Sequence, residues 1–249
     1  MRLLAIDIEQ DTEVEKMKKL DVLSIIPARS GSKGLPKKNL RECAGKPLIQ
    51  WTVEASLNSK YIKQTMVSTD CSEIQEIAID LGASAPKLRR TELSQDNSSM
   101  IDVVNDALRW TDVNFDILCL LQPTSPLRTT NHIDEAILMY ERFQRSDDET
   151  LISVKKIDNK YLWMLGFNES SGYLSPLHEF DFSNPRRQKL PECYYPNGAI
   201  YITNVKRIDT FYSDKIIPFF MDEESSVDID TERDLTIANN ILLKKMMVA

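Results

Sequence analysis

The sequence predicts an α/β protein built on a mostly parallel, doubly wound sheet. Apolar segments rich in β-branched residues recur along the first 150 residues, and segments with helical apolar spacing separate most of them. Such alternation places helices on both faces of a parallel sheet. With 249 residues, of which 42% are apolar, the chain can form one large domain or one domain with an appendage. Ligands of such sheets bind beyond the carboxyl ends of the strands.

Six segments have the composition expected of strands, each bounded by polar or turn residues. Four of them precede residue 155 and two lie in the last third of the chain. The predicted strands are Val22–Ile26, Gln64–Thr69, Asp116–Gln122, Thr150–Val154, Asn197–Thr203 and Ile216–Phe220.

Five helices are predicted from apolar spacing and end signals. The first follows Gly45 with Pro47 in its first turn. Its apolar stripe is predicted to be Leu48, Trp51, Ala55 and Leu57. The second begins with Ser72 and Gln75 as a capping box and ends at Gly82. The other three are Ser99–Trp110, Thr130–Arg145 and Thr231–Met246.

Two segments do not follow this alternation. Lys155–Glu192 is polar, rich in aromatic residues and without clear periodicity, which predicts an inserted arm over residues 155–195 of a domain spanning 22–249. Residues 1–21 form an N-terminal extension, and both an extra strand with a turn and a loosely attached leader are compatible with them.

Composition excludes several classes of protein. A net charge of −7 and a pI near 5.1 argue against nucleic-acid binding, which needs a basic face. The four cysteines are scattered without a CxxC pair and only two histidines accompany them, so neither a zinc site nor a disulfide framework is expected. No run of eighteen apolar residues occurs, and the N-terminus is acidic where a signal peptide would be apolar. We expect a cytoplasmic protein that binds neither nucleic acid nor membrane.

The segment from Ile25 to Leu40 concentrates positive charge directly after a predicted strand. It contains two glycines and four basic residues, namely Gly31, Gly34, Arg29, Lys33, Lys37 and Lys38. Glycines let backbone N–H groups approach anionic oxygens, and the basic side chains neutralise them. The loop matches neither GxxxxGK[ST] nor GxGxxG. A polyphosphate site is favoured, and a solvated basic turn is the alternative.

Asp228 and Asp230 stand two residues apart, so in an extended segment both side chains point to one side. A few carboxylates together with substrate phosphates suit Mg²⁺. The alternative is an acidic cap for the helix that begins near Thr231. The two roles are compatible.

Three further candidates are weaker when taken singly. Gln122 ends a buried strand and could bind a hydroxyl or carbonyl, or could satisfy backbone groups of its own loop. The Arg186-Arg187 doublet could bind a carboxylate or stay solvated. Tyr201 could contact a ligand or pack in the core.

The motifs PARSGSKGLPKKN, LLQPTSPLR, PNGAIYI and DIDTE, in this order, resemble those of the CMP-sialic acid synthetases. This family of acylneuraminate cytidylyltransferases includes the CMP-legionaminate and CMP-pseudaminate synthetases. The resemblance runs from about Leu23 to the C-terminus and implies a Rossmann-like nucleotidyltransferase fold. It also implies that CTP and a nonulosonate sugar acid give a CMP-sugar and pyrophosphate, that Mg²⁺ is required, and that the arm exchanges across a homodimer.

The same resemblance assigns the residues of the site. It implies catalytic roles for Arg29, Lys33 and Asp230, and metal binding by Asp228 and Asp230. The nucleotide would be bound by Arg29, Ser30, Gly31, Ser32, Lys33, Lys38, Asn39 and Arg90. The sugar acid would be bound by Gln122, Arg187 and Tyr201. The motifs do not identify the base that deprotonates the sugar. Ser30 replaces a glycine found in many members of the family, and we expect its N–H to stay available.

Two alternatives remain open from the sequence. One is activation of the eight-carbon acid 3-deoxy-manno-octulosonate, whose enzymes resemble this chain less well in the first motif and in PNGAIYI. The other is a catalytically silent nucleotide-binding protein on the same fold, which predicts lost phosphate or metal ligands. Arg29, Lys33, Asp228 and Asp230 are all present.

Overall fold

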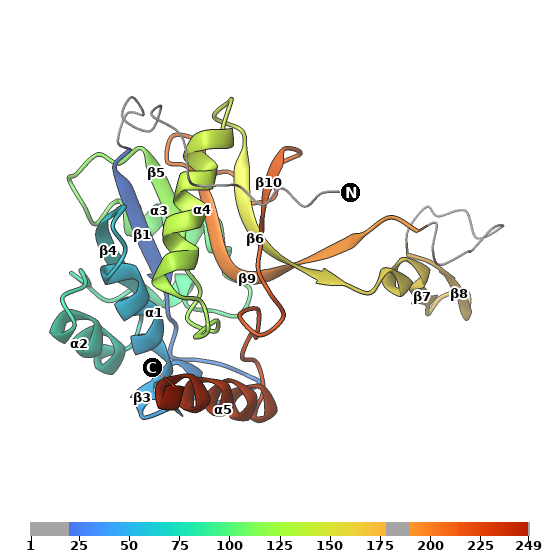
Figure 1. The fold of residues 1–249 in the computed structure, drawn as a ribbon, viewed down its shortest axis with the longest axis horizontal. Coiled ribbons are helices and arrows are strands. Elements are labelled where there is room, and N and C mark those ends of the chain that lie inside the picture. The colour runs from blue at the N-terminus through green and yellow to red at the C-terminus, as the bar shows by residue number, and fades with distance from the viewer. Residues whose placement is uncertain (1–19, 178–189, 249) are drawn as a thin grey trace.

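A six-stranded sheet forms the centre of the protein in a computed structural model that describes residues 20–177 and 190–248. The strand order is β10-β6-β9-β5-β1-β4 (Figure 1). Only β9 runs antiparallel to its neighbours, so the predicted mostly parallel sheet is confirmed. The strands are β1 (Val22–Pro27), β4 (Ile62–Ser68), β5 (Ile117–Leu120), β6 (Thr150–Ile157), β9 (Cys193–Asn204) and β10 (Ile216–Phe220).

Helices cover both faces of this sheet, as predicted. Along β1, Val22 and Ile26 pack into one core cluster whereas Leu23 and Ile25 pack into another, because alternate residues of a strand point to opposite faces. The first cluster includes residues of α1, α2 and α4, and the second includes residues of α3. These helices are α1 (Leu48–Leu57), α2 (Ser72–Asp80), α3 (Met100–Leu108) and α4 (Thr130–Phe143). Among the described helices, none is both long and apolar enough to cross a membrane.

Two details of the predicted helices are wrong. The buried face of α1 consists of Leu48, Ile49, Thr52, Val53 and Ser56, whereas Leu57 is exposed. Polar Thr52 and Ser56 were invisible to an apolar pattern because they are buried through hydrogen bonds, such as that from Ser56 to Ser24. The predicted capping box of α2 does not form either, because the Gln75 side chain donates to the Ala85 carbonyl instead. Gly82 does end α2, with a φ of +97°.

The C-terminal helix α5 (Glu232–Val248) lies across the end of the domain near a small hairpin (Figure 1). The hairpin consists of β2 (Glu42–Cys43) and β3 (Lys46–Pro47), whose turn residues Ala44 and Gly45 both have positive φ. The Ala44 N–H donates to the side chain of Asn239 in α5. Leu235, Ala238 and Leu242 of α5 pack in one cluster with Leu35 of the basic loop. Ile229, between Asp228 and Asp230, belongs to the same cluster, so α5 packs against both the basic loop and the acidic segment.

The segment between β6 and β9 projects from the domain as an arm (Figure 1). It is more regular than the sequence indicates, because it contains a 3₁₀ helix, η4 (Asn159–Trp163), and a hairpin of β7 (Leu165–Asn168) and β8 (Tyr173–Pro176). The Asn168 side chain accepts N–H bonds from Ser170 and Ser171, and Gly172 has a φ of +73°. The turn chemistry was present in the sequence, but the exposed strands lack apolar alternation. Residues 1–19 and 178–189, which include Arg186 and Arg187, lie outside the described residues.

Candidate functional site

Two neighbouring cavities open at the carboxyl ends of the parallel strands and share one wall residue, Gln122. The first, of about 270 Å³, is lined by residues that follow β1 and β5, among them Arg29, Lys38 and Thr124. The second, of about 250 Å³, lies against β9 and contains Tyr201 and Asp228. Gln122 lines both cavities, so a group bound in one lies close to a group bound in the other.

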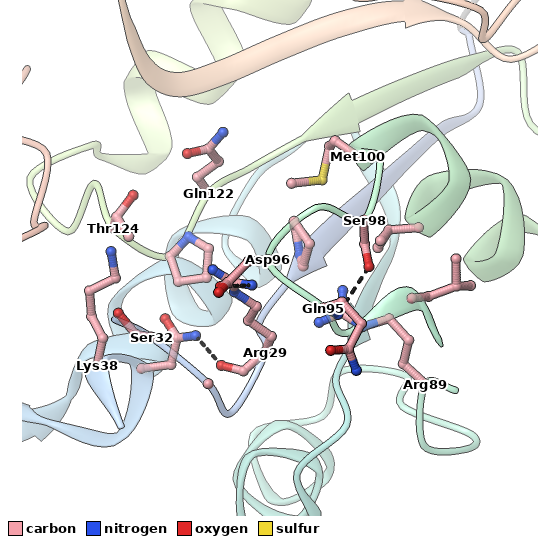
Figure 2. A pocket seen from close by; sticks show the side chains of 16 residues that line it. Arg29, Ser32, Lys38, Arg89, Gln95, Asp96, Ser98, Met100, Gln122 and Thr124 are labelled. Atoms are coloured by element: carbon pink, nitrogen blue, oxygen red, sulfur yellow. Dashed lines mark hydrogen bonds and ion pairs between the residues drawn. The ribbon is translucent and has the colours of Figure 1, made fainter. Parts of the chain in front are cut away.

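The basic loop after β1 directs its charges towards Asp96. The Arg29 guanidinium and the Lys33 ammonium each lie 2.7 Å from one oxygen of this carboxylate. Figure 2 shows Asp96 in the middle of the first cavity, beside Arg29. The hydrogen bond from Lys33 is the main cause that lowers the pKa of Asp96. Two of the side chains predicted to bind phosphate, Arg29 and Lys33, therefore converge on an anion supplied by the protein itself.

Three other residues of the loop have structural partners. The Ser30 N–H and hydroxyl donate to the two oxygens of Asp70. The expectation that this N–H stays available to a ligand is therefore wrong. Asn39 is buried and donates to the Arg29 carbonyl. A Cβ on Gly34 would stand 2.6 Å from the Asp230 carbonyl oxygen, whereas one on Gly31 would meet nothing. Gly34 is therefore required for contact with the Asp230 backbone rather than with a phosphate.

Lys38 connects the basic loop to the acidic segment. Its Nζ donates to the Ile229 carbonyl at 2.7 Å and to Asp230 Oδ1 at 2.9 Å. Lys38 also lines the first cavity (Figure 2). Since the Ile229 N–H donates to the Thr124 carbonyl, three motifs distant in the sequence meet at this point.

Asp228 and Asp230 offer an incomplete but suitable set of magnesium ligands. Ile229 between them is fully buried, and Asp228 lines the second cavity while Asp230 bonds to Lys38. Desolvation by the surrounding protein raises the pKa of Asp228, and the neighbouring charge of Asp230 raises it further. A bound cation would relieve both effects. No cluster of three metal-binding side chains occurs within residues 20–177 and 190–248, so substrate oxygens and water would have to supply the other ligands.

The predicted cap of the last helix is also present. The Thr231 hydroxyl accepts the Asp234 N–H, and the Asp234 carboxylate accepts the N–H groups of Asp230 and Thr231. Asp234, rather than Asp228 or Asp230, thus provides the acidic partner at this helix end. The carboxylates of Asp228 and Asp230 therefore do not cap this helix, and Asp230 pairs with Lys38 instead.

The structure places Arg89, and not Arg90, at the first cavity. Arg90 is exposed and pairs with Asp106 on α3. Arg89 is only 6% exposed and lines the cavity at the end opposite Lys38 (Figure 2). Burial is the main cause that lowers the pKa of Arg89, and nearby Arg29 adds to this. The sequence pattern does not tell which of these two adjacent arginines faces the cavity, because they differ only in burial.

The second cavity is polar and aromatic. Tyr201 is 7% exposed, and its hydroxyl lies 3.4 Å from that of Tyr212. Burial raises the pKa of Tyr201, so it is a neutral hydrogen-bonding group. Lys155, at the root of the arm, lines the same cavity and forms no ion pair with any residue that the structure describes. Arg187, the predicted sugar ligand, lies outside the described residues.

Sequence reasoning missed Arg89, Asp96, Lys155 and Tyr212. Arg89 and Asp96 belong to a segment without regular apolar spacing between α2 and α3, and Lys155 looks like any strand-end lysine. The segment RTELSQD, in which Asp96 is the last residue, was the available signal.

Residues 23–228 match the family described as cytidylyltransferase. The chain belongs to the cytidylyltransferase family, which consists of nucleotidyltransferases. It is 36% identical over 233 residues to CMP-N,N'-diacetyllegionaminic acid synthase of Legionella pneumophila, covering 89% of this chain and 96% of that protein. It is 32% identical to pseudaminic acid cytidylyltransferase of Campylobacter jejuni, with 87% and 94% covered.

A longer relative shows the same similarity. The chain is 35% identical to N-acylneuraminate cytidylyltransferase of Escherichia coli, covering 90% of this chain and 52% of that protein. This chain therefore spans about half the length of the E. coli cytidylyltransferase.

Solved structures share the cytidylyltransferase fold at low identity. CMP:2-keto-3-deoxy-manno-octonic acid synthetase complexed with CTP superposes with a TM-score of 0.69 at 18% identity, covering 90% of this chain and 99% of the other. The 4-diphosphocytidyl-2C-methyl-D-erythritol synthase of Anaerococcus prevotii gives 0.60 at 14% identity, with the same coverage. The predicted Rossmann-like nucleotidyltransferase fold is confirmed.

Proposed function

We propose that this cytidylyltransferase transfers CMP from CTP to the anomeric hydroxyl of a nine-carbon 2-keto-3-deoxy sugar acid of the N-acylneuraminate or legionaminate type. The observation that carries the proposal is the pair of cavities that meet at Gln122, one cationic and one polar and aromatic. Relatives at 32–36% identity are named for legionaminic, neuraminic and pseudaminic acids, which supports this substrate class.

The first cavity takes the nucleotide. Arg29 and Lys38 line this cavity and neutralise the triphosphate together with Lys33, once Asp96 is displaced from Arg29 and Lys33. Gly31, Ser32, Asn39 and Arg89 complete the wall of this cavity. A buried arginine at the far end suits the carbonyl and ring of a pyrimidine, since a guanidinium both donates and stacks.

The second cavity takes the sugar acid. Gln122 and Tyr201 bind its hydroxyls, and the ammonium of Lys155 is available to its carboxylate. We also propose that Arg187 contributes to binding of the sugar acid. Tyr195 and Tyr212 supply apolar surface and hydroxyl groups for the rest of the sugar.

The reaction is an in-line displacement at the α-phosphorus. The anomeric oxygen forms a bond to this phosphorus, the bond to the β-phosphate bridging oxygen breaks, pyrophosphate leaves, and the hydroxyl proton goes to solvent or a basic oxygen nearby. Positioning and charge neutralisation dominate such reactions. Asp228 and Asp230 would hold Mg²⁺, which neutralises phosphate charge when bound. Arg29, Lys33 and Lys38 then orient the phosphate chain, while Gln122 orients the attacking sugar.

We further propose a homodimer in the cytoplasm. Phe167, Tyr173 and Leu174 on the arm hairpin are 65%, 76% and 63% exposed, and apolar surface of this extent suits a second copy of the chain. All four cysteines are free, which suits a reducing compartment.

Pyrophosphate release tests the proposed function. The wild-type protein is incubated with CTP, Mg²⁺ and, in separate reactions, N-acetylneuraminate, legionaminate, pseudaminate and 3-deoxy-manno-octulosonate. We expect release with at least one nine-carbon acid and at least tenfold less with the eight-carbon acid, because the relatives at 32–36% identity are named for nine-carbon acids. Preference for the eight-carbon acid would favour the first alternative. Binding of CTP without release for any acid would favour a silent nucleotide-binding protein.

A further inference from the structure

Arg128 ends the LLQPTSPLR motif, and the function proposed above gives it no role. Its side chain is only 2% exposed. No carboxylate among the described residues forms an ion pair with it. Burial lowers the pKa of its guanidinium to about 10, which still leaves it charged at neutral pH. A buried charge without a counterion is unfavourable. Among the described residues only Nη1 of this guanidinium has hydrogen-bond partners, whereas Nε and Nη2 are buried without any.

These hydrogen bonds join two site motifs. Nη1 donates to the Gln122 carbonyl at 3.1 Å and to the Ala199 carbonyl at 3.0 Å. The backbone pairing of β5 with β9 ends at Leu120 and Tyr201, and the same register continued would place Gln122 opposite Ala199. Arg128 therefore supplies donors to two carbonyls where the ladder has stopped.

The same part of β9 is bulged. Its pairing with β6 is irregular between Ile152 and Val154, and the Ile200 N–H donates to the Ser153 hydroxyl. Gly198 in the bulge has a φ of +78°. Bulges beside active sites redirect the chain at the cost of regular hydrogen bonds. Here side chains replace those bonds.

The Gln122 side chain rests on this bulge. A Cβ at Gly198 would lie 3.2 Å from Gln122 Oε1 and 4.0 Å from Asp228 Oδ2. The position of the Gln122 amide thus depends on both main chains that Arg128 holds together. Arginine suits this role because one planar Nη1 carries two N–H groups in fixed directions, which a lysine ammonium does not offer.

We propose that Arg128 is a positioning residue that holds Gln122 at the boundary of the two cavities and so aligns the sugar hydroxyl with the α-phosphorus. The inference rests on the proposed function for its catalytic consequence. The structural part, that Arg128 joins the Gln122 loop to the β9 bulge, stands independently of the substrate.

A double-mutant cycle tests the catalytic part. Arg128→Lys is expected to lower kcat/KM for the sugar acid about 30-fold while KM for CTP stays within about twofold. In a Gln122→Ala background, the same change is expected to cost less than about threefold, because the group being positioned is gone. Arg109→Lys, on an exposed arginine after α3, is the matched control. Equal losses in both backgrounds, or an equal loss in KM for CTP, would overturn the positioning role.

Hydrogen exchange tests the structural part without any turnover. In Arg128→Lys, the amides of Ala199 and Ile200 are expected to exchange at least about tenfold faster, with no change in α5. A uniform increase throughout the protein, or no increase, would overturn the proposal. If wild-type protein releases no pyrophosphate with any acid, the proposed function fails while this result still decides what Arg128 does.

A measurement on the wild-type protein guards against a variant that does not fold. Two hydrogen bonds at one nitrogen slow rotation about the Cζ–Nη1 bond of Arg128. We expect separate, slowly exchanging Nη1 proton resonances in NMR spectra of the labelled protein. A single averaged resonance, typical of a freely rotating guanidinium, would contradict the inference.

Discussion

The ammonium of Lys38 lies 2.9 Å from Oδ1 of Asp230, although 192 positions separate the two residues in the chain. The contact joins the basic loop, predicted to bind phosphate, to the acidic pair, predicted to bind metal. Phosphate and metal sites must adjoin if one ion is to neutralise a nucleotide's phosphate charge. The Lys38–Asp230 contact therefore brings together the two halves of the proposed nucleotide site.

Lys38→Met should separate two effects of this contact. We expect kcat to fall about 100-fold because a phosphate-facing cation is lost. The Mg²⁺ concentration for half-maximal rate should fall as well, since the lysine no longer competes for Asp230. Lys37→Met is the matched control, because Lys37 is exposed and does not line the first cavity. A higher Mg²⁺ requirement in Lys38→Met would show that the contact assists metal binding.

Gly34→Ala should disturb the same junction through the backbone. The new Cβ would collide with the Asp230 carbonyl oxygen at 2.6 Å, so the loop and the acidic segment must move apart. We expect a loss of turnover of about tenfold and a higher Mg²⁺ requirement, measured by initial rates. Gly31→Ala meets open space and should lose less. The reverse order of the two variants would refute the role given to Gly34.

Asp96→Asn should strengthen nucleotide binding. The carboxylate occupies Arg29 and Lys33, so CTP must displace it before its phosphates reach these side chains. Removing the charge is expected to lower the dissociation constant for CTP about fivefold, as measured by calorimetry without sugar acid. Asp112→Asn removes the same charge from an exposed position that does not line the first cavity. Weaker binding in Asp96→Asn would mean that Asp96 orients the cations for the nucleotide.

Asp228→Asn should raise the melting temperature of the metal-free protein at neutral pH. The folded-state pKa of Asp228 is raised, so ionisation is less favourable in the fold than in the unfolded chain. Its contribution to stability is therefore greatest at acid pH and is lost as pH rises through the raised pKa. We expect the melting temperature of the variant to exceed that of wild-type protein by about 1–2 °C at pH 7, a difference that solvent screening keeps small. At low pH we expect no difference between the two melting temperatures.

Magnesium should oppose this difference in melting temperature between wild-type protein and Asp228→Asn. Mg²⁺ is expected to stabilise wild-type protein more than Asp228→Asn in the same thermal scans, since the variant loses a ligand. Equal stabilisation of both proteins would remove Asp228 from the metal site.

The arm should hold two copies of the chain together. Phe167→Asp places a charge on a side chain that is 65% exposed in the single chain, and we expect sedimentation equilibrium to report monomers. Ile79→Asp is the matched control, on an α2 side chain that is 53% exposed. A wild-type protein that is monomeric and fully active would contradict the shared arm.

Much of the fold follows from local sequence signals. Each of the six predicted strands exists, because buried strands such as β1 are predominantly apolar. The hairpin β7–β8 was missed since its exposed side chains have no buried face to impose a period of two. The predicted buried face of α1 was partly wrong because Thr52 and Ser56 are buried as hydrogen-bonded polar groups.

The residues of the site were predictable where they belong to a sequence motif. They were not predictable where burial determines which residue faces the cavity. The loop around Arg29, the Asp228–Asp230 segment and Gln122 do border adjoining cavities. The choice of Arg89 over Arg90 depends on which neighbour faces inward, and the Asp96 bridge depends on tertiary contact alone. Neither leaves a periodic signal in the sequence.

The most direct test of the central claim is to follow the complete reaction by ³¹P NMR. Wild-type protein, CTP, Mg²⁺ and a nine-carbon sugar acid are mixed, and all phosphorus species are counted over time. The proposed function predicts one CMP diester and one pyrophosphate for each CTP consumed, with neither formed when the acid is omitted. CTP that stays intact with every nine-carbon acid, or CMP released without transfer to the sugar, would contradict it.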